Sequence, residues 1–456
     1  MAMLLKKVWE SVSNRATSFS SSSIDSVTTP PSYTESSSSL GDFDRLPIDV
    51  VLQIVRLVGP KDAARLSVVC KSWRPLVSDN RLWIYFLQNY HDTWDSVFFV
   101  ETHLRSGYPI QTFSSPITEL SFMRIYGQRV QVPGAVIVDG GSGHCKYGWS
   151  KNACPSGRSA TFLAFFHSLS PLELYGLKIS LQSLQDADTE AARASRRQLK
   201  DAIYTALFDM NVPAVCAINQ ATLALYAAQR TSGIVVNIGF QVTSVVPILH
   251  GKVMRTVGVE VMGVGALKVT GFLREQMQQN NLNFESLHTV QTLKENLCYV
   301  AADYEAELYK DTQASFEVPG EGWFTLSKER FKTGEVLFQP SIAGVCAMGL
   351  QQAVALCMDH CHASELTEDD AWFKTIVLSG GTSCLPGLAE RLEKELHGLL
   401  PPSISNGIRV ISPPYGADSA WIGAKLIGNV SYFITNYLDH AKLDIFTTVM
   451  FSCRTS

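Results

Sequence analysis

AVIVDGGSGHCKYGW, residues 135–149, is the stretch that decides the fold. The apolar run 135–138 predicts a buried strand, the glycines after Asp139 predict a turn, and apolar residues return on both sides of Lys146. Backbone can approach a phosphate where glycine removes the side chain, Asp139 could hold a hydrated cation, and Lys146 could offset phosphate charge. The stretch therefore predicts either half of a phosphate site or an ordinary hairpin with a glycine turn.

The composition indicates a globular chain of two or three domains. It has 456 residues, of which 46% are hydrophobic and 18% charged, with a formal net charge of −4. The absence of a basic excess argues against direct nucleic-acid binding, and no apolar run is long enough to predict a membrane span. The N-terminus lacks the clean apolar run of a secretory signal, and the ten scattered cysteines indicate reduced thiols. We therefore expect a protein of the nucleus, the cytoplasm or both.

The first ninety residues divide into two regions. Residues 1–41 are dominated by Ser and Thr and cannot bury enough apolar surface to offset chain entropy, so we expect disorder. Within 42–90, apolar residues at helical spacing predict three short helices, the first of which ends at Gly59-Pro60. Three short helices form a marginal core, so such a region gains stability by packing on another surface.

The region 42–90 resembles an F-box domain. The match lies in Leu46-Pro47, in LSVVCKSWRPL at 66–76 and in Leu82-Trp83, with the family's spacing. The resemblance implies docking to a Skp-type adaptor, as in cullin-based ubiquitin ligases. A helical capping subdomain that shares the pattern is the alternative, and residues 91–130 are expected to form a packed connector. The expected partner-binding residues are Leu46, Pro47, Val50, Val51, Ile54, Leu66, Trp73, Leu82 and Trp83.

From residue 131 to residue 430 the chain resembles actin and its relatives. The hairpin at 135–149 stands in the family's first phosphate motif, and GIVVNIGFQVTSVVPI at 233–248 is a weak internal repeat of it. The stretches 211–227 and 294–301 are similar to a connecting helix and a ribose- and base-contacting helix. IVLSGGTSCLPG at 376–387 is similar to the family's adenosine motif.

This second resemblance implies an α/β fold. It consists of duplicated ribonuclease-H-like domains around a nucleotide cleft, preceded here by the small three-helix F-box. The implied cofactor is ATP or ADP with Mg²⁺, and no residue is expected to ligate a metal directly. The implied nucleotide-binding residues are Asp139, Gly141, Ser142, Gly143, Lys146, Gln220, Gly239, Lys294, Glu295, Gly380, Gly381 and Thr382.

The second hairpin departs from the family where the chemistry of hydrolysis lies. Where the family has a carboxylate this chain has Asn237, and where the family has a second acidic residue it has Phe240. The next position, a glycine in the family, is Gln241, and the family's histidine is replaced by Ser244. Loss of an anion near Mg²⁺ and of a water-orienting group costs orders of magnitude in rate. We therefore expect little or no ATPase activity and no catalytic residue. Nucleotide binding remains one hypothesis, and a cleft kept only for architecture is the other.

Two further departures concern polymerisation. The interval between Asp139 and Asn237 is short for the family, which predicts a truncated outer subdomain, and residues 431–456 diverge from the family's C-terminal end. Since the outer subdomain carries a filament contact in the family, we expect no actin-like filament.

The order of F-box and actin-like region is similar to that of a plant class of actin-related proteins. It implies a protein-interaction adaptor in which the F-box docks to a Skp-type subunit and the actin-like region holds a client protein. A structural subunit of a nuclear complex is the alternative. A nucleotide-dependent enzyme or polymer comes last, because the second hairpin has lost its charges.

Overall fold

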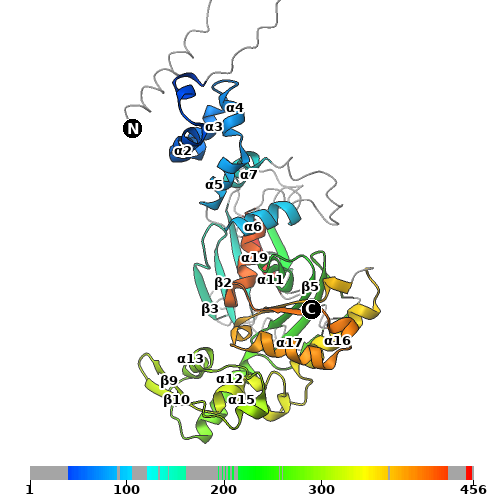
Figure 1. Cartoon of the computed structure of the whole chain (residues 1–456). Helices are drawn as coiled ribbons and strands as arrows, with labels where there is room; N and C mark the ends of the chain where they lie inside the picture. Colours follow the sequence, from blue (N-terminus) through cyan, green and yellow to red (C-terminus); the bar gives the residue numbers. More distant parts are fainter. Residues whose placement is uncertain are drawn as a thin grey trace, which may run out of the picture. The chain divides into compact units, whose positions relative to one another are not determined.

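The computed structural model divides the chain into two compact units (Figure 1). It describes residues 40–89, 93–104, 121–131, 134–141, 143–160, 214–255, 257–258, 260–367, 370–429 and 448–453, with a few helical positions between 194 and 209. Unit 1 comprises the described residues within Met1–Trp94 and Ser114–Val130, and unit 2 those within Asp95–Phe113 and Gln131–Ser456. The disorder predicted for residues 1–41 falls almost wholly outside the described residues.

Unit 1 is a small helical domain. Gly59, whose φ of +92° suits glycine, ends the first helix, and Pro60 begins the next, where its missing N–H costs nothing. The Asp79 carboxylate accepts a hydrogen bond from the backbone N–H of Arg81 and caps a later helix. Its elements are the 3₁₀ turn η1 (Gly41–Arg45), α2 (Ile48–Val58), α3 (Pro60–Leu66), α4 (Trp73–Val77), α5 (Asn80–Gln88) and α7 (Phe122–Gln131).

Helix α7 joins unit 1 from beyond the predicted F-box boundary. The Asn80 side chain accepts a hydrogen bond from the Phe122 backbone N–H at 3.0 Å, and the Tyr126 ring lies 5.3 Å from that of Trp83. The described residues 95–104 of the predicted connector belong to unit 2 instead. Part of α6 (Trp94–Phe99) and the π-helical turn η2 (Val100–Leu104) belong to unit 2 and pack into its core. The described residues of 93–104 and 121–130 are therefore divided between the two units.

Unit 2 contains two sheets of matching topology. In each, three antiparallel strands are followed by two parallel ones, so the internal repeat predicted from the two glycine-containing hairpins is present in the fold. The first sheet has the order β3 (Gly157–Ala160), β2 (His144–Trp149), β1 (Ala135–Gly140), β13 (Thr448–Cys453) and β4 (Ala214–Asn219). The second has the order β12 (Arg409–Ile411), β11 (Thr375–Ser379), β5 (Gly233–Ile238), β6 (Thr243–Leu249) and β7 (Lys252–Val253), with β8 (Glu260–Met262) also paired to β6.

Strand β13 comes from the segment predicted to diverge from the family. It lies between β1 and β4 and runs parallel to both, with Ser452 opposite Asp139 on one side and Ile218 on the other. In the second sheet the corresponding position is filled by β11, which precedes its neighbour β12 in the chain. The divergent segment 431–456 thus supplies an internal strand. The predicted truncated outer subdomain falls between β3 and β4, outside the described residues.

Helices α11 (Gln220–Ala227) and α19 (Ser419–Gly428) connect the two sheets. Helix α11 follows β4 of the first sheet but packs on β5 of the second, whereas α19 packs on β1 of the first. The two helices pack on each other so closely that a Cβ on Gly423 would lie 1.9 Å from the Leu223 carbonyl oxygen. Only glycine permits this approach of two backbones.

The remaining elements of unit 2 cover the second sheet and extend beyond it (Figure 1). Apolar side chains of these helices and of β5, β6 and β11 form one continuous core. The elements are α12 (Ala266–Gln279), α13 (Leu287–Leu297), α14 (Tyr304–Glu307), β9 (Ala314–Val318), β10 (Gly322–Leu326), α15 (Glu329–Glu335), η4 (Pro340–Ala343), α16 (Leu350–Ala363), η5 (Asp370–Trp372), η6 (Gly381–Cys384), α17 (Leu388–Leu399), α18 (Pro402–Ser405) and η7 (Gly416–Asp418).

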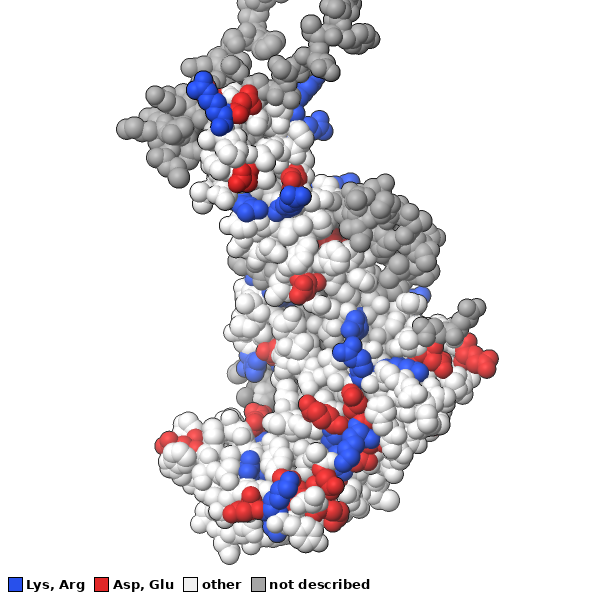
Figure 2. Space-filling model, viewed as in Figure 1, with Lys and Arg blue, Asp and Glu red and all other residues white. Residues whose placement is uncertain are grey.

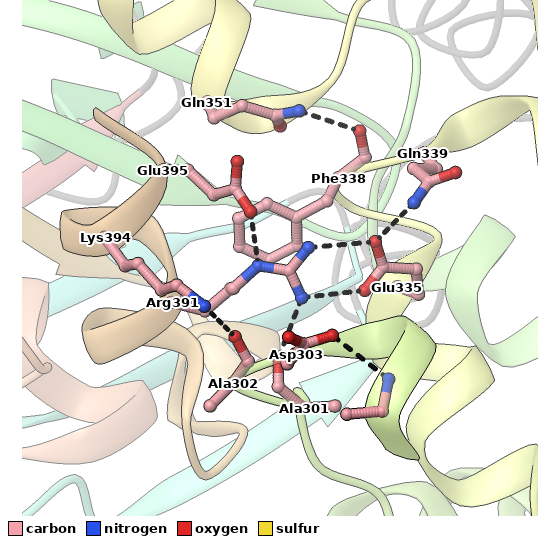
Figure 3. Close-up of polar contacts among 11 residues, drawn as sticks. Ala301, Ala302, Asp303, Glu335, Phe338, Gln339, Gln351, Arg391, Lys394 and Glu395 are labelled. Carbon is pink, nitrogen blue, oxygen red and sulfur yellow. Dashed lines mark hydrogen bonds and ion pairs between the residues drawn. The ribbon is translucent and has the colours of Figure 1, made fainter. Parts of the chain in front are cut away.

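A buried ion pair links α15 to α17 (Figure 3). The Arg391 guanidinium contacts the Glu335 carboxylate at 3.1 Å, donates to the Ala301 carbonyl at 2.8 Å and lies over the Phe338 ring. Burial raises the pKa of Glu335, although Arg391 draws it back down. Since Glu335 is fully buried, removal of the arginine would leave an unpaired buried charge, at a cost of about 3–5 kcal/mol.

Charged side chains of both signs lie on the described surface of unit 2. On the face shown in Figure 2, Lys and Arg side chains of unit 2 are interspersed with Asp and Glu. Among the described helices, none has the length and apolar character needed to cross a bilayer.

We predict that Gly423→Ala destabilises the protein. Alanine favours a helix over glycine by about 1 kcal/mol, but overpacking against the Leu223 backbone costs about 1–3 kcal/mol and the two helices must move apart. The control is Gly271→Ala in α12, where a Cβ would meet nothing within 4 Å. Thermal unfolding should show a lower melting temperature for Gly423→Ala only. Equal behaviour of the two variants would refute the close approach of α11 and α19.

Candidate functional site

The first hairpin brings a buried carboxylate and an ammonium together. Asp139, at the end of β1 and 3% exposed, stands opposite Lys146 in the ladder with β2. The Lys146 Nζ lies 3.9 Å from Asp139 Oδ2 and 3.3 Å from Asp418 Oδ1, and it donates to the Ala417 carbonyl oxygen. Asp418 also pairs with Arg158 at 2.6 Å. The ammonium predicted to offset phosphate charge therefore has carboxylate and carbonyl partners within the protein.

A chain of side-chain hydrogen bonds joins the two sheets. The Gln220 amide donates to Asp139 Oδ1 at 2.8 Å, and the Asn237 amide donates to Gln220 Oε1 at 3.2 Å. Gln220 is held there because Asn219 caps α11 by accepting from the Ala221 backbone N–H, which makes Gln220 the first helical residue. Asn237 lies on β5 and is 5% exposed.

The amide of Asn237 suits this chain better than a carboxylate. Gln220 uses its NH₂ group toward Asp139, so its oxygen needs a donor on the other side. Asn237 supplies that donor, whereas an ionised aspartate would have none. The neutral residue that we expect, from the resemblance, to stand in place of an actin-family carboxylate is thus accommodated by its neighbours.

The turn of the second hairpin carries an aromatic ring toward the first. Gly239 donates its N–H to the Val242 carbonyl at 3.0 Å and closes the turn that holds Phe240 and Gln241. The Phe240 side chain lies against Gly143, since a Cβ built on that glycine would lie 2.8–3.0 Å from three Phe240 carbon atoms. Phe240 therefore separates the first hairpin from anything that would approach its described tip on this side.

The predicted adenosine-binding residues form a second group. Gly380, with a φ of +96°, packs so closely on the second hairpin that a Cβ would lie 2.2 Å from the Ile238 carbonyl oxygen, whereas a Cβ on Gly381 would be in ordinary contact with the Ala417 side chain at 3.9 Å. Lys294 is buried, which lowers its pKa, and its Nζ lies 3.0 Å from Thr270 Oγ1 and 3.5 Å from Thr382 Oγ1. Glu295 is exposed and accepts a hydrogen bond from Gln291.

The structure thus brings together most of the residues implied by the resemblance. Ser142 lies outside the described residues, and Glu295 is held by its own helix. Asp418, Arg158 and Thr270 were missed, because each is far in sequence from the group it contacts and no local motif marks it. In the described part of the chain, no three His, Cys, Asp or Glu side chains are placed to hold a metal ion.

The predicted partner-binding residues of unit 1 separate by burial. Leu46 and Pro47 are exposed and Val50, Ile54 and Leu66 are half-buried. Against the prediction, Val51, Trp73, Leu82 and Trp83 are buried in the domain's own core and present no surface in this conformation. Large apolar side chains that were not predicted are exposed instead, namely Ile48 at 66%, Leu57 at 74%, Val68 at 85% and Val69 at 41%.

The reason for this difference is general. Helical periodicity finds the apolar stripe that faces the core, and in α2 that stripe contains Val51 and Val55. The exposed apolar residue Leu57 of the same helix lies outside that stripe. The sequence signal for such an exposed residue was therefore an apolar residue that falls outside the helical spacing of the core-facing stripe.

We predict that Asn237→Asp destabilises the protein in a pH-dependent way. With two carboxylates flanking Gln220, one must face the amide oxygen, and an unmatched buried polar group costs about 1–3 kcal/mol. Burial and the like charge of Asp139 raise the folded-state pKa of the new carboxyl, so the loss is full at neutral pH. It shrinks as pH falls toward about 4, where a protonated carboxyl can donate.

Melting temperatures of the variant and the unmodified chain across this pH range provide the measurement. Asn406→Asp, at an exposed asparagine, is the matched control and should differ little at any pH. A loss for Asn237→Asp that does not change with pH would argue against the hydrogen-bond chain.

Comparison with known proteins agrees with both halves of this architecture. The F-box domain family matches residues 43–85, and the actin family matches residues 189–288 and 277–438. A protein of Arabidopsis thaliana named actin-related protein 8 is 62% identical over 452 residues, which cover 94% of this chain and 96% of that protein. A protein of the same name from Oryza sativa subsp. indica is 59% identical over 460 residues, covering 95% of each. Actin-like protein 7B of Rattus norvegicus is 30% identical over 227 residues, covering 49% of this chain and 53% of that protein.

These matches confirm the predicted fold and the resemblance to a plant class of actin-related proteins. The F-box match coincides with the helices of unit 1 up to α5, and the actin match spans the second sheet and its helices. The chain therefore belongs to the actin family, as an actin-related protein that carries an F-box domain.

Proposed function

We propose that this chain is a protein-interaction adaptor whose F-box docks to a Skp-type subunit and whose actin-like region holds a client protein. The observation that carries the proposal is the set of exposed aliphatic side chains in unit 1. They lie just before α2, along α2, and in the turn between α3 and α4. Leu46, Ile48, Leu57, Val68 and Val69 make up this exposed aliphatic set.

The energetics favour a partner over solvent. Full burial of one such side chain gives about 1.5–3 kcal/mol, so two or three of them at the centre of an interface contribute about 3–9 kcal/mol before the entropic cost of association is subtracted. Apolar side chains of this size are exposed singly on many proteins. Five of them within residues 46–69 of a domain from a family that docks adaptors support a docking role.

The proposed function includes no ATP hydrolysis. At the second hairpin, Asn237 is neutral and serves as a hydrogen-bond donor to Gln220, and the position of the family's histidine is Ser244. Gln220, the residue that would orient water, is itself held between Asp139 and Asn237. These contacts support a role for the actin-like region as a scaffold.

Docking is tested by co-purification of the full-length chain with a purified Skp-type subunit. We expect the unmodified chain to bind, and the double variant Ile48→Asp with Val68→Asp to lose at least about tenfold in affinity, since about 1.4 kcal/mol corresponds to that factor. Both positions are exposed, so the fold should survive. Leu46→Ala with Pro47→Ala should weaken binding in the same direction.

The matched control is Trp323→Asp, at a 71% exposed aromatic residue on β10 of unit 2. It changes an apolar surface residue to the same charge outside the F-box and should leave binding intact. Failure of the unmodified chain to bind the purified subunit would count against the adaptor role.

The absence of hydrolysis is tested by phosphate release from MgATP. We expect a rate no higher than that of buffer, and release that depends on protein concentration and disappears in Gln220→Leu would contradict the proposal. We also propose that the chain forms no actin-like filament. Sedimentation under polymerising salt conditions should leave it in the supernatant, and a pellet containing fibres would overturn this view.

A structural subunit of a nuclear complex is the second candidate. It is favoured by the burial of Val51, Trp73, Leu82 and Trp83, which shows how much of the F-box pattern builds the domain itself. We propose localisation in the nucleus, the cytoplasm or both. Recovery of the chain from nuclei in a large assembly that lacks the Skp-type subunit and cullin would favour this candidate over the adaptor.

A further inference from the structure

The two described glycines at the tip of the first hairpin have roles within the protein. Neither Gly141 nor Gly143 has a positive φ, so backbone conformation does not require glycine at either position. A Cβ on Gly141 would lie 2.8 Å from the His144 carbonyl oxygen, and one on Gly143 would lie 2.8–3.0 Å from Phe240 carbon atoms. Gly141 is thus needed by the turn itself, and Gly143 by an aromatic ring.

The charged groups of the same hairpin are also engaged. Lys146 contacts Asp418 and the Ala417 carbonyl, and Asp139 accepts from Gln220. Asp139 is 3% exposed. A polyphosphate with Mg²⁺ would need the ammonium, the carboxylate and open glycine backbone at once. In the described residues, the ammonium, the carboxylate and the glycine backbone are each in contact with another part of the chain.

We infer that the phosphate half of the nucleotide site implied by the actin fold is filled by this chain's own Phe240. The Phe240 ring on Gly143 and the bonds from Asn237 through Gln220 to Asp139 link the two hairpins directly. They make the connection that a bound polyphosphate would otherwise make, and a nucleotide does not fit there while Phe240 stays in place. Unit 2 is therefore held closed without a ligand.

The inference explains a combination that is otherwise contradictory. The first hairpin retains the family's glycines although the second has lost its anion. A glycine kept for phosphate has no purpose once phosphate is no longer bound. A glycine that accommodates Phe240 remains necessary, because Phe240 Cβ and Cγ are near the backbone and cannot move as freely as the end of a flexible side chain.

A double-mutant cycle tests the contact itself. Gly143→Ala in the full-length chain should lower the melting temperature by several degrees, since the new Cβ meets the Phe240 ring. In the Phe240→Gly background, which removes all three contacting carbon atoms, the same substitution should cost nothing measurable. If Gly143→Ala is harmless in the unmodified chain, or costs the same in both backgrounds, the contact does not exist and the inference fails.

Ligand binding tests the consequence. Equilibrium dialysis with labelled MgATP should show no saturable uptake by the unmodified chain up to millimolar nucleotide. Phe240→Gly, which opens the space over Gly143, should gain saturable binding, whereas Phe240→Leu, which keeps the space filled, should not. Lys146→Ala in the Phe240→Gly background should reduce the gained affinity at least about tenfold, because Lys146 is the cation of the first hairpin and can exchange its Asp418 contact for a phosphate oxygen.

Each result bears on the inference. Saturable binding of MgATP by the unmodified chain overturns it, and so does its absence from a Phe240→Gly variant that circular dichroism shows to be folded. If that variant does not fold, the inference is decided by the MgATP-binding isotherm of the unmodified chain and by the melting temperature of the Gly143→Ala single variant. Docking to the Skp-type subunit concerns unit 1 and can succeed or fail independently of these outcomes.

Discussion

The fold of unit 2 depends on the close approach of α11 and α19 at Gly423 and Leu223. Each helix packs on one sheet and touches the other helix, so their separation sets the distance between the two sheets. Backbone contact of this kind leaves no room for adjustment, because protein interiors are close-packed. The polar chain from Asp139 to Asn237 spans between the same two sheets and can form only at that distance.

On this frame the chain has kept the architecture of the actin family and changed its interior chemistry. Asn237 provides a donor where the family has a carboxylate, and Lys146 has Asp418 as a partner. These groups are compatible with one another, since each has a hydrogen-bond partner or an opposite charge beside it. An unmatched donor or acceptor at these positions would leave buried polar atoms unsatisfied, which is costly in a core.

Local patterns allowed much of this to be predicted from the sequence. Short stretches of sequence predict the glycine-containing hairpins, the GGT stretch at 380–382 and each F-box helix. They do so because turns, caps and helical spacing are local properties. The position of β13 between β1 and β4 is a pairing across the whole chain, and no local signal specifies it. The same holds for Asp418 beside Lys146 and for the burial of Trp83, where a long-range contact decides the outcome.

The return of α7 to unit 1 has a consequence for how such a protein can be assembled by gene fusion. The described residues up to Trp94 belong to unit 1, those of 95–104 to unit 2 and those of 121–130 to unit 1 again, so the F-box is not joined to the actin-like region by a single junction. A cut at residue 90 would remove α7 from Trp83 and Asn80 and leave an aromatic core open to water. Recombination that moved only the residues matching the F-box family would transfer an incomplete domain. In this chain the F-box helices form one unit with α7, the helix that directly precedes the actin-like region.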